Sequence, residues 1–144
     1  MEHALTRIDF HSNVPDKIQY ACRLVRKARA ANCRIVLLAR ASDLASLDLA
    51  LWALSDDAFL PHVMAGDPLA AQTPIVLTDS VAVALPHHHV LINLSDATPE
   101  HFARFERMFE VISADEGDKT AGRERFRFYK QRGYPLTHNV AEPA

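Results

Sequence analysis

The sequence predicts a three-layer α/β/α sandwich around a mostly parallel sheet, Rossmann-like in layout. Short apolar runs alternate with helical patterns along the chain, as in successive βαβ units. The apolar run within residues 34–39 is typical of a strand covered on both faces. A chain of 144 residues that is 49% hydrophobic suits one domain. We therefore expect a single domain over residues 1–144, with a loose tail from about residue 140.

Five strands are expected from local patterns. The first alternates apolar and polar residues from Arg7 to His11, and the others are short runs rich in β-branched residues and leucine. The predicted strands are 7–11, 34–39, 74–78, 90–94 and 109–112. The stretch from Pro61 to Pro74 shows little periodicity.

Four helices are expected between these strands. Asn13 is placed to cap the first helix, with Pro15 in its first turn and an end near Asn32. Ser42 and Asp43 open a second helix, and a short third helix begins near Pro99. The last helix covers about residues 119–132 and ends at Gly133, a residue suited to the left-handed conformation that terminates helices.

Composition excludes several classes of protein. A formal net charge of −2 argues against a protein that coats nucleic acid with its whole surface. No run of about 18 apolar residues could cross a membrane, and the N-terminus lacks the pattern of a secretory signal. Two sparse cysteines, Cys22 and Cys33, are expected to be reduced thiols. These observations predict a cytoplasmic protein with no membrane partner.

No motif for catalysis or for a cofactor is present. The four glycines cannot form a G-x-G-x-x-G loop. Gly117-Asp118-Lys119-Thr120 resembles the end of a P-loop, but Asp118 would repel phosphate and Ser113 stands at the first glycine position. We predict no catalytic residue and no cofactor.

Histidines are the other candidates for chemistry. Neighbouring side chains of the run from His87 to His89 would point to opposite faces of an extended segment, and no spacing typical of metal ligands surrounds them. His62 lacks a partner nearby in sequence and is interpreted as a hydrogen-bonded structural residue. No metal site is predicted.

The last helix concentrates positive charge. Residues 117–134 carry six basic side chains against Asp118 and Glu124. Four of the basic residues form one stripe that also holds Phe126; they are Lys119, Arg123, Arg127 and Lys130. The stripe has three interpretations: a solvated basic face, a shallow pocket for an acidic aromatic peptide, or a contact for nucleic acid. Periodicity does not choose among them.

Motifs distributed along the chain resemble those of a known family. They are Leu51-Trp52 with Phe59-Leu60-Pro61-His62, the strands at 74–77 and 91–94, the segment 105–112, and Gly122-Arg123-Glu124-Arg125 followed by Tyr129-Lys130 and Gly133-Tyr134. In this order they are similar to the chi subunit of bacterial DNA polymerase III holoenzyme.

This resemblance implies a non-catalytic accessory protein. Chi proteins link the clamp-loader complex, through the psi subunit, to single-stranded DNA-binding protein, and thus reach DNA mainly indirectly. The ligand is that protein's acidic C-terminal tail, which ends in an aromatic residue with a free carboxylate. The positions that match the family's pocket are Trp52, Lys119, Arg123, Phe126, Arg127, Tyr129 and Gly133, with Phe59 supporting its wall.

Two of these positions depart from the family's pattern. Phe126 stands where tyrosine is common and so lacks a hydroxyl, and Arg127 stands where lysine is usual. The alternative functions are a small-molecule or nucleotide-binding α/β domain and a protein that binds single-stranded DNA directly through the basic C-terminal helix. The sequence does not locate the psi-binding surface.

Overall fold

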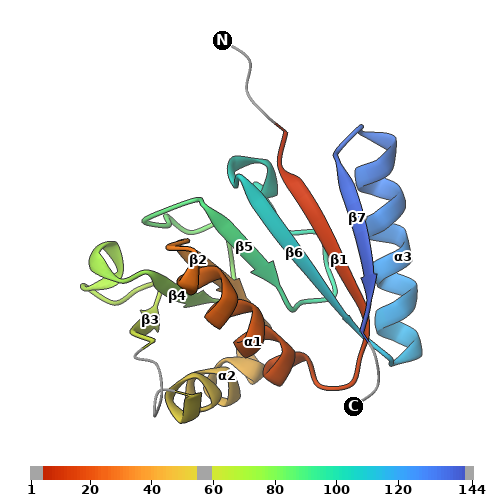
Figure 1. The fold of residues 1–144 in the computed structure, drawn as a ribbon. Coiled ribbons are helices and arrows are strands. Elements are labelled where there is room, and N and C mark those ends of the chain that lie inside the picture. The colour runs from red at the N-terminus through yellow and green to blue at the C-terminus, as the bar shows by residue number, and fades with distance from the viewer. Residues whose placement is uncertain (1–4, 55–59, 142–144) are drawn as a thin grey trace.

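The fold is a seven-stranded sheet with helices on both faces (Figure 1), seen in a computed structural model that describes residues 5–54 and 60–141. The strand order is β3-β4-β2-β5-β6-β1-β7, and every described pair of neighbours is parallel. The strands are β1 (Arg7–Val14), β2 (Ile35–Leu38), β3 (His62–Met64), β4 (Ile75–Thr78), β5 (Val90–Asn93), β6 (Arg107–Ser113) and β7 (Leu136–Val140). The helices are α1 (Lys17–Ala30), α2 (Ala41–Ala53) and α3 (Glu116–Gln131). The predicted fold class is confirmed.

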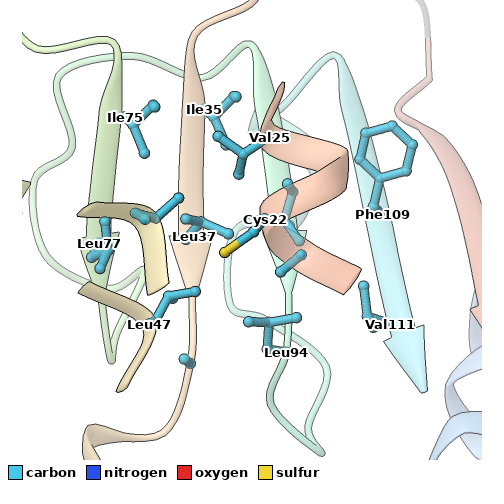
Figure 2. Packing of buried hydrophobic residues seen from close by; sticks show 14 of the residues in the cluster. Cys22, Val25, Ile35, Leu37, Leu47, Ile75, Leu77, Leu94, Phe109 and Val111 are labelled. Carbon is cyan, nitrogen blue, oxygen red and sulfur yellow. The ribbon is translucent and has the colours of Figure 1, made fainter. Parts of the chain in front are cut away.

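Alternation along the central strands creates two cores. In β2, Ile35 and Leu37 pack under α1 and α2 together with Cys22 and Leu47, as Figure 2 shows. The residues between and after them point to the other face and pack with α3. All four residues of β2 are buried, as the apolar run predicted. Helices α1 and α2 therefore cover one face of the sheet, and α3 covers the other.

The first helix begins later than expected. Asp16 caps α1, since its carboxylate accepts a hydrogen bond from the backbone N–H of Gln19 at 3.1 Å. The predicted cap, Asn13, instead lies near the end of β1 with φ +58°, a left-handed conformation that asparagine tolerates. The strand thus extends past His11 because pairing with β6 and β7, which local periodicity does not reveal, continues there.

Pairing and burial also change the expected structure in two other places. The helix predicted near Pro99 is only a 3-10 turn over Phe102–Arg104, because Phe102 and Phe105 are both drawn into the core beneath α3. The segment after Pro61, which lacks periodicity, contributes the edge strand β3.

The C-terminal segment is the largest difference. It contains a strand that local patterns do not predict, β7, which ends at Val140 and pairs in parallel with β1. The backbone N–H of Ala141 continues this association by donating to the carbonyl of Ser12 at 2.8 Å. Four of the five residues of β7 are exposed, so the strand lacks the apolar alternation that identifies strands in a sequence. Residues 142–144 lie outside the described part of the chain.

A buried polar network attaches α3 to the centre of the sheet. Glu110 on β6 is completely buried and accepts three hydrogen bonds. The donors are Asn93 Nδ2 at 2.8 Å, Arg125 Nε at 3.0 Å and the Tyr129 hydroxyl at 2.6 Å. Burial raises the pKa of Glu110 against the opposing effect of these donors, and burial beside Glu110 raises the pKa of Tyr129, so its hydroxyl remains a donor.

A second contact joins the first turn of α1 to the first turn of α3. Asp118, in the first turn of α3, accepts hydrogen bonds from Lys17 Nζ at 2.9 Å and from the backbone N–H of Ser113 at 2.7 Å. Burial alone would raise the pKa of Asp118, but these donors and the charge of Lys17 outweigh it and lower that pKa.

Removing the Tyr129 hydroxyl tests the buried network. We expect Tyr129→Phe to lower the free energy of unfolding by about 2 kcal/mol. Glu110 loses one hydrogen-bond donor, and because the site is buried, no water can take the place of the missing hydroxyl. Tyr134→Phe is the matched control, since the Tyr134 ring packs on Phe102 and its hydroxyl has no hydrogen-bond partner among the described residues. Denaturant unfolding of both variants measures the effect, and equal losses would contradict the role assigned to Glu110.

The pH dependence of stability tests the contact of Asp118. The pKa of the Asp118 carboxyl is lower in the folded protein than in the unfolded chain, where an aspartate has a pKa of about 3.9. Its ionised form therefore stabilises the fold above that unfolded pKa, and this stabilisation is lost as the pH falls through the folded pKa. Asp118→Asn should therefore destabilise the protein most above about pH 5 and progressively less toward about pH 3. Asp79→Asn, at an exposed aspartate, should change stability little at any pH. Parallel curves for wild type and Asp118→Asn would count against this account.

Candidate functional site

A groove of about 660 Å³ runs between α3 and the edge of the sheet formed by β1 and β7. Its lining comes from α3 and from the three strands β1, β6 and β7. The lining residues are Phe10, Ser12, Asn13, Ile112, Lys119, Gly122, Arg123, Phe126, Arg127 and His138. Four of the sequence-predicted site residues meet here: Lys119, Arg123, Phe126 and Arg127.

The rotation of α3 places the cations on one wall of this groove. Asp118, Gly122, Arg125 and Tyr129 are the buried residues of the helix, and their spacing of three or four residues defines the side that faces the sheet. Lys119, Arg123 and Arg127 recur every four residues and thus line the helix beside that side. The buried network therefore determines where these three charges point.

The floor of the groove is apolar. The Phe126 ring meets the edge of Phe10 with centroids 5.0 Å apart, and Ile112 lies beside them. Gly122 allows this arrangement, because a Cβ atom at that position would lie 2.5 Å from Ile112 Cδ1. A larger residue at position 122 would force Ile112 to move.

The opposite wall contains residues that sequence reasoning missed. Ser12 and Asn13 come from the end of β1, and His138 comes from β7. The Ser12 hydroxyl and His138 Nε2 lie 2.7 Å apart within hydrogen-bonding distance. His138 faces the groove because it is in register with Phe10 on the neighbouring strand. Without β7, no pattern in the sequence places His138 near α3.

The groove is electropositive. Three cationic side chains line it, and none of the described residues that line it is acidic. Glu116 approaches Lys119 with Oε1 3.5 Å from Nζ, but its side chain is 84% exposed, so this pair is strongly screened. A positive wall above an apolar aromatic floor suits a ligand that combines carboxylates with an aromatic ring.

Trp52 does not belong to this groove, which corrects the expected pocket. It lies on α2, which packs on the other face of the sheet, and its ring contacts His62 at the β3 edge with centroids 4.4 Å apart. The β3 and β7 edges are at opposite ends of the strand order. A single ligand residue therefore cannot contact both Trp52 and Phe126. Phe59 lies outside the described residues.

Tyr129 and Gly133 are also separate from the groove. Tyr129 has no exposed surface and donates to Glu110, so it supports the helix from below. Gly133, with φ +80°, terminates α3 as predicted and is not among the residues that line the groove. Of the other basic residues of α3, Arg125 is buried and Lys130 is exposed outside the groove lining.

The position where related α/β folds bind nucleotides is unsuitable for phosphate here. A crevice of about 530 Å³ opens at the carboxyl ends of the central strands. Five aspartates line it, and its two cations are already paired, Lys17 with Asp118 and Arg40 with Asp96, each at 2.9 Å. The acidic lining weakens the nucleotide-binding alternative.

The histidines have separate structural partners. His62 Nδ1 bonds to the carbonyl of Leu60 at 2.7 Å, as its interpretation as a structural residue required. His87 Nε2 contacts the Thr73 carbonyl, His88 packs on Phe105, and His89 Nε2 lies 3.2 Å from Glu106. Within residues 5–54 and 60–141, no three His, Cys, Asp or Glu side chains are grouped so that they could hold a metal ion. No helix in these ranges is long and apolar enough to span a bilayer.

Comparison with known proteins agrees with the motifs in the sequence. Residues 5–137 match the family described as DNA polymerase III chi subunit, HolC. The DNA polymerase III subunit chi of Pseudomonas aeruginosa is 31% identical over 137 residues, covering 92% of this chain and 94% of that protein. The subunit of the same name from Haemophilus influenzae is 26% identical, covering 85% and 86% of the two chains, and that from Escherichia coli is 26% identical, covering 62% and 61%. The chain therefore belongs to the DNA polymerase III chi subunit family.

Proposed function

We propose that this replication protein is a non-catalytic adaptor that binds the acidic C-terminal tail of single-stranded DNA-binding protein in the groove between α3 and the β1–β7 edge. The proposal rests on the lining of this groove, which combines three cationic side chains with an aromatic floor and has no acidic residue among those described. Through the psi subunit, the adaptor connects this tail to the clamp loader. In this role it reaches DNA mainly indirectly, through these partners.

Each part of the tail has a counterpart in the groove. Arg123 lies between Lys119 and Arg127 on the cationic wall, where its guanidinium can take the terminal carboxylate through two parallel hydrogen bonds. The terminal aromatic ring fits against Phe126, Phe10 and Ile112 on the floor. Lys119 and Arg127 attract the acidic residues that precede the end of the tail.

The opposite edge of the sheet offers a surface for the second partner. Leu49 and Trp52, three residues apart on α2, are 70% and 46% exposed. Met64 on β3 adds an exposed apolar side chain at the same edge. Exposed apolar groups of this kind favour burial against another protein. We assign this apolar edge to the psi subunit, which leaves the groove free for the tail.

Loss of one groove cation tests tail binding. Arg123→Ala should weaken binding of an acidic peptide that ends in phenylalanine by about tenfold or more, because the charge-assisted contact with the terminal carboxylate is lost. Amidation of the peptide's C-terminus should cause a similar loss. Fluorescence anisotropy of a labelled peptide measures both effects, and affinity should fall markedly between about 0.05 and 0.3 M salt.

Lys130→Ala is the matched control for this experiment. It removes one positive charge from the same helix, but Lys130 is exposed outside the groove, so affinity should change less than about threefold. Equal losses in the two variants would indicate general attraction to a basic helix. Unchanged binding by Arg123→Ala would place the tail elsewhere.

The assignment of two separate surfaces is tested with Trp52. Trp52→Ala should leave peptide affinity within about twofold of wild type, since Trp52 lies on the other face of the sheet. The same variant should lose co-purification with the psi subunit. Leu49→Glu should give the same result without disturbing the contact between Trp52 and His62. The control is Val140→Ala, which changes an exposed apolar residue on β7 and should affect the binding of neither partner strongly. Loss of peptide binding by Leu49→Glu would refute the assignment of two separate surfaces.

A further inference from the structure

Helix α1 carries a concentration of positive charge that the proposed function does not use. Its 14 residues include five basic side chains and no acidic one, so it is more one-sided in charge than α3. The acidic residues lie mainly elsewhere, since residues 35–116 contain twelve Asp and Glu against three Lys and Arg. The net charge of −2 therefore conceals a second basic helix.

The charges of α1 point away from the sheet. Ala21, Cys22 and Val25 are its buried residues. Arg23, Arg26 and Lys27 are exposed on the opposite side, and Tyr20 lies at the margin of the same side, half-buried. We name these four residues the α1 basic face. It lies on the side of the sheet opposite the α3 groove, because α1 and α3 belong to different cores.

These three cations are unpaired within the described part of the chain. No described carboxylate lies within 4.0 Å of Arg23, Arg26 or Lys27, whereas Lys17 at the start of the helix is paired with Asp118. Arg23 and Arg26, and Arg23 and Lys27, are separated by three and four residues, where like charges repel. Lys27 lies in the last turn and is favoured by the helix dipole, but Arg23 and Arg26 lie outside that turn.

We propose that the α1 basic face is a contact for the phosphate backbone of single-stranded DNA. Phosphates would relieve the repulsion among Arg23, Arg26 and Lys27, and at physiological ionic strength acidic groups beyond about 8 Å oppose such a contact little. The half-buried Tyr20 ring lies beside these charges, with the Arg23 guanidinium over it at 5.5 Å from its centroid and the His11 ring against it at 5.3 Å between centroids.

Single-stranded DNA fits this face better than a second acidic peptide does. The groove beside α3 has an apolar floor that holds a side chain, whereas the exposed side of α1 presents charges and one aromatic edge. A phosphate chain supplies evenly repeated negative charges and needs no apolar cavity. Because the two surfaces lie on opposite sides of the sheet, a tail and a DNA strand can bind at once.

Matched triple variants of the full chain test this contact. The probe is fluorescein-labelled oligothymidine of about 20 nucleotides, followed by anisotropy at several salt concentrations. Arg23→Gln/Arg26→Gln/Lys27→Gln should weaken DNA binding about tenfold or more and reduce the slope of log K against log salt by about 2, as expected when three phosphate contacts are lost. Its binding of the acidic peptide should remain within about twofold of wild type.

The control triple is Lys119→Gln/Arg123→Gln/Arg127→Gln, which removes the same number of charges from the α3 groove. It should lose the peptide and keep the DNA. Equal loss of DNA in both triples, loss only in the α3 triple, or no DNA binding by wild type would overturn the proposal. So would binding of polyglutamate, or of vesicles containing phosphatidylglycerol, to the α1 basic face as tightly as oligothymidine. Failure of peptide binding in wild type would contradict only the proposed function.

Discussion

The attachment of α3 to Glu110 is the constraint on which the geometry of the basic groove depends. A carboxylate with no exposed surface is stable only with donors around it, and Arg125 and Tyr129 supply two of the three from one side of the helix. This requirement fixes the rotation of α3 about its axis. Lys119, Arg123 and Arg127 must then line the groove, and Gly122 must pack against Ile112. The buried pair of Glu110 and Arg125 thus determines where the three cations of the groove lie.

Parallel strand order distributes the surfaces of the molecule. Strand β7 adds to β1 at one edge and creates the wall that contains His138, while β3 adds to β4 at the other edge beside Trp52. Ligands bound at these two opposite edges would not compete for space. The two basic helices lie on opposite faces for the same topological reason, since α1 follows β1 and α3 follows β6 on different sides of the sheet.

Charge in this protein acts locally. Salt screens exposed charges beyond about one Debye length, so the net charge of −2 says little about any one surface. The aspartate-lined crevice at the carboxyl edge repels phosphate, and the groove beside α3 attracts carboxylates. The crevice lies where Rossmann-like folds bind phosphate, but its five aspartates make it unfavourable for an anion.

The sequence alone predicted the parts of the protein that local patterns encode. Apolar runs identified the central strands β2, β4 and β5, Gly133 marked the end of α3, and motifs spread along the chain indicated the family. It also identified Lys119, Arg123, Phe126 and Arg127 as residues that share a helical stripe. Long-range pairing decided the rest: β7 has no apolar alternation, Trp52 and Phe126 proved to lie on opposite faces, and Arg125 and Tyr129 became buried partners of Glu110. Periodicity places residues around one helix, but only packing against the sheet determines which of them meet another strand, the solvent or a ligand.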